Sequence, residues 1–372
     1  MKDENPFRYG MVVEGENYCD RPELSRQFVK LVSSGQNLVI QGERRMGKTS
    51  FVCETVKSMK GCRLLYVDLF CVKTIPEFCR RVVEAVSRLD ASDSFIRKVA
   101  RMIGNLRPVL SVDRDTGAPM LTIDARAVSG MASVEEVMSL VESHSRSGKL
   151  CVVFDEFQDV LDIPESDVLL ARLRAMIQFQ GKTPFVFLGS VRNKMNAVFD
   201  SPKSPFFKSA MSFSVDAINE ADFMRFIIAR FRSVGRTLDE DMALRIIRLV
   251  DNVSGDVQEL CETIWLATAI GCRISETDVQ VGLNTVFARE MKAFAALLSG
   301  LTSVQMSVLR GLADPSRPKL FSGEFLSLNG IKNVGSVTRA VKRLEEKEIV
   351  YDLNGSWRFT NPFFREWLCR RV

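Results

Sequence analysis

The feature that most constrains the fold of this chain is the segment Gly42–Thr49, which reads GERRMGKT. It matches the pattern G-x-x-x-x-G-K-[ST] at every fixed position. A short apolar run, Leu38–Gln41, precedes it, and a helical pattern extends from Lys48 to about Met59. A loop between a strand and a helix in this arrangement points its backbone N–H groups at phosphate oxygens. The motif therefore predicts a phosphate-binding loop on an α/β core.

Single positions of the loop have separate roles in this interpretation. Gly42 and Gly47 permit backbone conformations that a side chain would block. Lys48 is placed to reach the β- and γ-phosphates of ATP, and the hydroxyl of Thr49 to bind Mg²⁺. The predicted nucleotide contacts are Gly42, Glu43, Arg44, Arg45, Met46, Gly47, Lys48, Thr49 and Ser50.

An acidic pair follows another apolar run. Residues Leu150–Phe154 are followed by Asp155 and Glu156. At the carboxyl end of a parallel strand, the first carboxylate can hold Mg²⁺ through water, and the second can orient or deprotonate the attacking water. The alternative is that two carboxylates merely end a strand. We predict Lys48, Asp155 and Glu156 as catalytic residues, and Thr49 with Asp155 as the magnesium site.

Further polar residues are candidates with less specific signals. One of Arg44 and Arg45 is expected to contact nucleotide or stabilise developing charge, and the other to pair with an acidic neighbour. The sequence leaves open which is which. The apolar run Pro184–Leu188 also ends in polar residues, although strand ends are often polar. The candidates there for sensing the γ-phosphate are Ser190, Arg192 and Asn193.

The order of apolar and helical patterns predicts the domain organisation. As far as residue 215, continuous apolar runs alternate with helices, which is typical of a parallel sheet covered on both faces. We predict a P-loop core in 1–215, with an insertion at about 90–132, an all-α lid in 216–299 and a winged helix-turn-helix in 300–372. Within the insertion, a basic helix and two short strands around a turn at Asp115–Gly117 are expected.

The C-terminal segment is predicted as a winged helix because three helical patterns precede a hairpin signal at Asn354-Gly355. Residues 297–372 carry 12 Lys/Arg and 7 Asp/Glu, which accounts for the whole net charge of +5. The third helix, Ser336–Lys347, would enter the major groove of double-stranded DNA. The predicted DNA contacts are Arg339, Lys342, Arg343 and Arg358. A solvated helix face or a protein-docking module is the alternative, since glutamates share the same helix.

Composition excludes several other classes of function. The one histidine, His144, lies in a polar stretch and is expected at the surface, which argues against histidine-based zinc sites and serine hydrolases. The nine cysteines form no C-x-x-C pair, so buried free thiols of a reducing compartment are expected. Neither a run of about 20 apolar residues nor an apolar N-terminal segment is present. We therefore expect a cytoplasmic protein.

Several segments resemble the prokaryotic archaeal-type ATPases of the AAA+/STAND group. The resemblance rests on NPF near the start, DRPEL, GERRMGKTS, YVDLF, VVFDEFQDV, FLGSVRNKM and SPFFKSA, in the order of the family. It implies ATP binding by Gly42–Ser50, roles for Asp155 and Glu156 in magnesium binding and hydrolysis, and a lid over the nucleotide. The chain departs from the family at Ser254–Val257, where Val257 stands in place of the proline of a Gly-x-Pro element.

Three functional interpretations remain at this stage. The leading one is Mg²⁺-dependent ATP hydrolysis that drives a conformational switch, with DNA bound by the winged helix. A signalling switch whose winged helix binds a protein partner is the second, and an origin-recognition-like initiator is the third. The sequence leaves the oligomeric state open.

Overall fold

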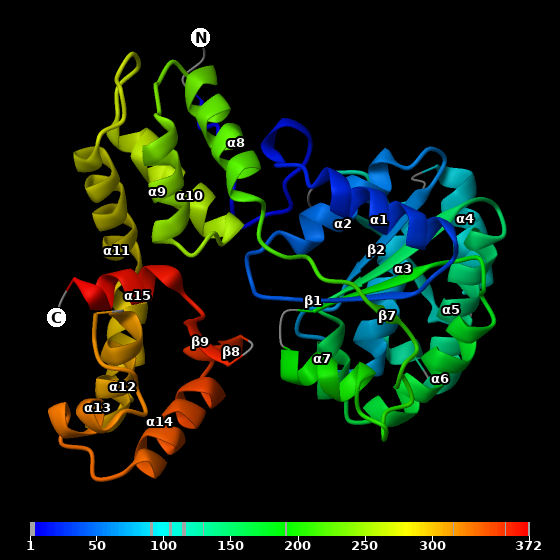
Figure 1. Ribbon diagram of the computed structural model, residues 1–372. Helices are drawn as coiled ribbons and strands as arrows, with labels where there is room; N and C mark the ends of the chain where they lie inside the picture. Colours follow the sequence, from blue (N-terminus) through cyan, green and yellow to red (C-terminus); the bar gives the residue numbers. More distant parts are fainter. Residues whose placement is uncertain are drawn as a thin grey trace. The chain divides into compact units, whose positions relative to one another are not determined.

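The computed structural model describes residues 4–89, 92–103, 106–113, 117–128, 130–189, 192–314, 316–353 and 355–370. The chain divides into two compact units, which are described separately (Figure 1). The sheet unit comprises Asp20–Glu43 and Gly47–Asp216. The helical unit comprises Met1–Cys19, Arg44–Met46 and Ala217–Val372. None of the helices in the described ranges is both long and apolar enough to cross a membrane.

The sheet unit is built on a five-stranded sheet in the order β2-β5-β6-β1-β7. All the pairings between these strands are parallel. The strands are β1 (Leu38–Gln41), β2 (Arg63–Asp68), β5 (Leu150–Asp155), β6 (Phe185–Gly189) and β7 (Met211–Ser212). Strands β5 and β6 are buried at every position, which explains why they read as continuous apolar runs. The predicted parallel sheet is confirmed.

Helices cover both faces of this sheet (Figure 1). On one face, Val39, Phe154 and Phe187 belong to a large apolar cluster with helices α3, α5 and α6. On the other, Phe28 of α1 contacts Phe51 of α2, with ring centroids 5.5 Å apart. The helices are α1 (Pro22–Ser33), α2 (Lys48–Ser58), α3 (Ile75–Ser87), α5 (Met131–Ser145), α6 (Ser166–Gln178) and α7 (Arg192–Phe199). Alternate strand residues thus face opposite helical layers.

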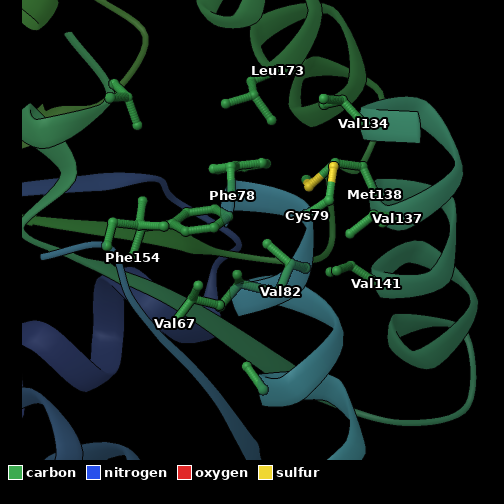
Figure 2. Packing of buried hydrophobic residues seen from close by; sticks show 14 of the residues in the cluster. Val67, Phe78, Cys79, Val82, Val134, Val137, Met138, Val141, Phe154 and Leu173 are labelled. Carbon is green, nitrogen blue, oxygen red and sulfur yellow. The ribbon is translucent and has the colours of Figure 1, made fainter. Parts of the chain in front are cut away.

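Figure 2 shows how α3 fills the space between the sheet and the outer helices. The Phe78 ring stacks on Phe154 of β5, with centroids 6.2 Å apart. One residue further on, Cys79 points away from the sheet toward Met138 of α5. All four side chains are fully buried, so α3 holds the central strands rigidly from one side.

The segment predicted as an insertion contains the expected helix and hairpin. Helix α4 (Asp93–Met102) is followed by β3 (Pro108–Val112) and β4 (Pro119–Ile123), which pair antiparallel. Their connecting residues 114–116 lie outside the described ranges. Strand β4 packs on α3 through buried residues such as Leu121, whereas β3 is largely exposed.

The prediction of a surface position for His144 is wrong. The side chain is 4% exposed, and its Nδ1 lies 2.7 Å from the carbonyl oxygen of Leu140, one turn back in α5. The ring also meets Phe95 of α4, with centroids 5.0 Å apart. Helix α4 packs over this polar end of α5 and buries the histidine. The residues next to His144 in the sequence do not indicate this contact.

The free cysteines follow the prediction only in part. All nine are unbridged, and Cys19, Cys53, Cys79, Cys151 and Cys261 are buried. Three others are half-buried, and Cys71 is exposed in the loop after β2. The expectation that the thiols are buried is therefore wrong for Cys71.

The segment predicted to be all-α contains four successive helices. They are α8 (Glu220–Ser233), α9 (Glu240–Leu249), α10 (Ser254–Ala267) and α11 (Glu276–Ser299). Ser275 and Asp278 form a capping box at the start of α11, in which each side chain accepts from the backbone N–H of the other residue. The N-terminal Phe7 packs in the same unit, with its ring 4.7 Å from that of Phe231.

The remainder of the helical unit has the order predicted for a winged helix. It consists of α12 (Ser303–Ala313), α13 (Gly323–Leu328), α14 (Val334–Glu346), β8 (Val350–Leu353), β9 (Ser356–Phe359) and α15 (Pro362–Cys369). Strands β8 and β9 pair antiparallel across the predicted hairpin. Asn354 lies outside the described residues, and Gly355 has a φ of +83°, which favours glycine.

Candidate functional site

The phosphate-loop motif connects β1 to α2 and begins the helix with Lys48. Gly47 has a φ of +78°, a conformation that glycine adopts without strain. The Lys48 side chain folds back over the loop, where its ammonium donates to the carbonyls of Gly42 at 3.0 Å and Glu43 at 2.7 Å. The Lys48 stem packs close to Gly42, where an added Cβ would lie at ordinary contact distance, 3.5 Å from its Cδ. The loop thus holds a buried cation at the N-terminus of a helix, an arrangement suited to phosphate.

The structure brings Thr49 and Asp155 together, although 106 positions separate them. The Thr49 hydroxyl donates to Oδ2 of Asp155 at 2.7 Å. The Tyr66 hydroxyl donates to the same oxygen at 2.8 Å, and the N–H of Glu156 donates to Oδ1 at 2.9 Å. The parallel register pairs Tyr66 of β2 with Val153 of β5, two residues before Asp155 and on the same face of the sheet, so the tyrosine hydroxyl can reach this carboxylate. Sequence reasoning gave Tyr66 no role at the site, although the segment YVDLF, which begins with Tyr66, is part of the family resemblance.

Burial dominates the electrostatics of this carboxylate. It raises the pKa of Asp155 above its usual value, and the hydrogen bonds from Thr49 and Tyr66 act in the opposite direction. Burial and the nearby Asp155 charge together raise the pKa of Tyr66. The three donors named above are all uncharged. A divalent cation beside Asp155 would therefore stabilise its ionised form strongly.

The donor set fits Mg²⁺. Magnesium prefers oxygen ligands and is commonly held by one or two protein groups together with waters and substrate phosphates. The Thr49 hydroxyl donates its hydrogen to Asp155, and an oxygen in this position can still act as a cation ligand. Among the residues that the structure describes, no three His, Cys, Asp or Glu side chains gather as a metal site. A cation here would take its remaining ligands from nucleotide and water.

Glu156 follows Asp155 at the turn from β5 into the short 3₁₀ helix η4 (Phe157–Asp162). Its backbone is left-handed, with a φ of +48° and a ψ of +42°. This conformation costs about 1 kcal/mol in a non-glycine residue and is common at functional sites. The amide Nε2 of Gln158 donates to Oε2 of Glu156 at 2.6 Å. The turn therefore sets both the backbone and the carboxylate of the predicted general base.

The two loop arginines differ in their partners within the helical unit. Arg45 forms an ion pair with Asp256 at 2.7 Å and a second, shorter one with Glu259, both on α10. Its carbonyl also accepts from the N–H of Gly255 at 2.8 Å. Arg44 lies 3.6 Å from Glu348 in an exposed pair. Arg45 is thus the arginine with buried acidic partners, the point that the sequence left open.

The structure describes only some of the other residues predicted to contact nucleotide. Ser190 lies outside the described residues. Arg192 and Asn193 begin α7, directly after β6, but their side chains are not described. The γ-phosphate contacts proposed for these three positions therefore stay predictions. Met46 is buried and Ser50 is buried in the first turn of α2.

In the C-terminal segment, α14 separates basic from apolar residues. Its buried side is formed by Val337, Ala340, Val341 and Leu344. Arg339, Lys342, Arg343 and Arg358 are all exposed. Arg343 also pairs with Glu346 at 2.6 Å, and Arg339 donates to the Ser336 hydroxyl at 3.3 Å. The helix presents a basic surface in which one cation already has an acidic partner.

Comparison with known proteins supports this architecture. Residues 292–370 match a family model described as a probable winged helix domain. A Walker-type ATPase of Pyrococcus abyssi is similar over 96% of this chain and 97% of its own, with 17% identity and a TM-score of 0.66. The ORC2 protein of Aeropyrum pernix in its ADP form covers 95% and 97%, at 14% identity and a TM-score of 0.52. No curated protein sequence matches the chain.

A third solved structure extends the comparison. The ORC1 protein of Aeropyrum pernix in complex with DNA matches over 95% of this chain and 93% of its own, with 13% identity and a TM-score of 0.50. Identities this low establish the fold alone. The fold class predicted from the sequence, a P-loop α/β core with a helical segment and a winged helix, is confirmed. The resemblance to archaeal-type ATPases is supported at the level of the fold.

Proposed function

We propose that this protein binds and hydrolyses ATP with Mg²⁺. One observation carries the proposal: the Thr49 hydroxyl at the end of the phosphate loop lies 2.7 Å from the Asp155 carboxylate at the end of β5. This contact joins a phosphate-binding element to a cation-binding group. The similar ORC2 structure was solved in an ADP form, which agrees with a nucleotide ligand at this fold.

Each residue of the site has a role in this reaction. The loop amides and the Lys48 ammonium bind the phosphates, and Thr49 with Asp155 would hold Mg²⁺, which neutralises phosphate charge when bound. Glu156 accepts a proton from the attacking water, whose oxygen bonds to the γ-phosphorus while the bond to the bridging oxygen breaks. ADP leaves with that electron pair, and inorganic phosphate is the second product. The buried Asp155 stays in place because three donors fix it.

The test is ATP turnover by the purified chain with Mg²⁺. Lys48→Ala removes the buried ammonium, so turnover is expected to be lost. Lys60→Ala is the matched control, since it removes the same charge from an exposed position just beyond α2. The proposal fails if the Lys48 variant retains full turnover, or if the wild-type chain neither binds nor hydrolyses ATP.

We further propose that the winged helix binds double-stranded DNA. The exposed basic residues of α14 support this, as does the presence of DNA in the similar ORC1 structure. Such binding should weaken steeply with salt, because each phosphate contact contributes about −0.9 to the slope of log K against log salt. Arg339→Ala should reduce both affinity and slope. Arg310→Ala, which removes an exposed charge from α12, should change neither as much.

A flat salt response would favour the second candidate, a winged helix that binds a protein partner. The pairing of Arg343 with Glu346 is the observation behind this alternative, since the glutamate offsets the charge of that arginine on α14. We also propose that the chain is divided into a core (1–215), a lid (216–299) and a winged helix (300–372), and that the protein is cytoplasmic. In the DNA-binding candidate, ATP turnover drives a switch between states of the chain. In the protein-binding candidate, bound nucleotide holds one state until a partner binds, and basal turnover is near zero.

A further inference from the structure

The side chain of Gln158 is the feature from which we draw this inference. It is 2% exposed and lies in the 3₁₀ helix η4, two residues after Glu156. Its Nε2 donates to Oε2 of Glu156 at 2.6 Å and approaches Oδ1 of Asp159 at 3.2 Å. One buried amide therefore contacts two carboxylates, one of which is the predicted general base.

The chemistry of these neighbours fixes the orientation of the amide. Oxygen and nitrogen of a glutamine side chain are assigned from their hydrogen-bond partners. Carboxylates only accept hydrogen bonds when ionised, so the group facing Glu156 and Asp159 must be the NH₂. The reversed orientation would bring a carbonyl oxygen against two carboxylates at hydrogen-bond distance. The donor role of Gln158 toward Glu156 follows.

The oxygen of the same amide lacks the hydrogen bonds that its nitrogen has. Its Oε1 is buried, and none of the residues that the structure describes donates a hydrogen bond to it. It faces Gly189 at the end of β6, where an added Cβ would lie only 2.6 Å from it. A buried acceptor without a donor costs stability, and an apolar side chain of the same shape would avoid that cost. Packing alone therefore does not explain a glutamine here.

The backbone of Glu156 is a second feature of this turn that costs conformational free energy. Its left-handed backbone is unfavourable for a residue with a Cβ. The strained turn places Gln158 so that its amide reaches back to the carboxylate two residues earlier. Two unfavourable local features thus accompany one short hydrogen bond to the predicted base.

We propose that Gln158 is a positioning residue that holds the Glu156 carboxylate in place for proton transfer from the attacking water. The inference rests on the proposed ATPase function. It assigns Gln158 no contact with nucleotide. Loss of the amide should let the carboxylate rotate away, which lowers the turnover number without changing how tightly ATP binds.

The test uses Gln158→Met in the full chain, because methionine keeps the shape and removes both the donor and the unpaired acceptor. We expect kcat to fall by about tenfold or more, while KM and the Kd for ATP stay unchanged. The free energy of unfolding should change little, because loss of the donor to Glu156 lowers it and loss of the unpaired acceptor raises it. Gln158→Glu, which is isosteric but lacks the donor, should lose turnover as well. Gln178→Met, at an exposed position on α6, is the control.

Each result distinguishes the inference from the function on which it rests. Wild-type turnover with an unchanged kcat in Gln158→Met overturns the inference and leaves the ATPase proposal intact. A parallel fall in kcat and stability also overturns it, because it indicates a purely structural role. A rise in kcat would show that the amide restrains the base, which contradicts positioning. A wild-type chain without ATP turnover overturns both proposals.

Discussion

Replacement of Arg45 by methionine is predicted to destabilise the helical unit strongly. The Arg45 guanidinium lies 2.7 Å from a carboxylate oxygen of Asp256 and also pairs with Glu259. The side chains of these two acids are 3% and 9% exposed, whereas that of Arg45 is 36% exposed. Methionine preserves most of the aliphatic stem but leaves two buried carboxylates without their cation.

The magnitude follows from burial. Removal of one partner from a buried ion pair costs about 3–5 kcal/mol, and the partial exposure of Arg45 favours the lower end, about 3 kcal/mol. The neighbouring residue supplies the control. Arg44 is 3.6 Å from Glu348, and both side chains are 56% exposed. Arg44→Met should therefore cost less than about 1 kcal/mol.

The loss should also depend on pH. Burial raises the pKa of Asp256 to about 7, although the Arg45 charge acts to lower it. Glu259, Glu290 and Asp251 raise it further. The folded chain then holds this proton more tightly than the unfolded chain, whose aspartates titrate near pH 3.9. This carboxyl therefore makes the wild type less stable as pH rises from about 4 through 7. At pH 5 Asp256 is protonated, so Arg45→Met should cost less there than at pH 8.

Urea unfolding followed by tryptophan fluorescence measures this loss. The three tryptophans, Trp265, Trp357 and Trp367, all belong to the helical unit, and Trp265 lies on α10 with both acids. The reasoning is refuted if the Arg45 and Arg44 variants lose the same small amount of stability. It is also refuted if the cost of Arg45→Met is no smaller at pH 5 than at pH 8.

Three further substitutions test the packing of the site and its surroundings. Tyr66→Phe removes one donor to Asp155, so we expect a loss of about 1.5–3 kcal/mol, visible as faster hydrogen exchange in peptides that cover β2 and β5. Gly189→Ala would place a Cβ 2.5 Å from Met195 Sδ, and circular dichroism should show a thermal midpoint lowered by the equivalent of about 1–3 kcal/mol. Gly282→Ala would bring a Cβ within 2.7 Å of α10, so the urea midpoint reported by tryptophan should fall, by about 1–3 kcal/mol in stability.

The strands of the core could be predicted from the sequence because their burial is recorded locally. A strand covered on both faces is apolar at successive positions, as in β5 and β6, and the predicted bounds differ from the observed ones by one residue. Helix α5 is missing from the sequence-based prediction, although its buried residues also recur in a regular pattern. Val134, Val137, Met138 and Val141 recur at helical spacing, and all are buried. The serines and glutamates between these residues interrupt the apolar positions, so the helical periodicity of the segment was overlooked.

Contacts between residues far apart in the sequence could not be predicted from hydrophobic periodicity. The sequence predicted that Thr49 and Asp155 share a cation, because the motif specifies both residues. It assigned Tyr66 no contact with Asp155, since a tyrosine in a strand is usually explained by packing. The cover over His144 likewise comes from Phe95, 49 positions earlier in the chain. Such pairs depend on how elements pack, which hydrophobic periodicity does not report.

Arg45 shows how far such a contact can alter the interpretation of a motif. As a variable position of the phosphate loop, it suggested a nucleotide contact. Its partner Glu259 lies 214 positions further along, and Arg45 also has a left-handed backbone with a φ of +65°. The residues on either side of Arg44–Met46 belong to the sheet unit. The ion pairs of Arg45 with Asp256 and Glu259 are contacts within the helical unit. A variable position of the phosphate-loop motif is therefore occupied by a residue whose charge stabilises the packing of that unit.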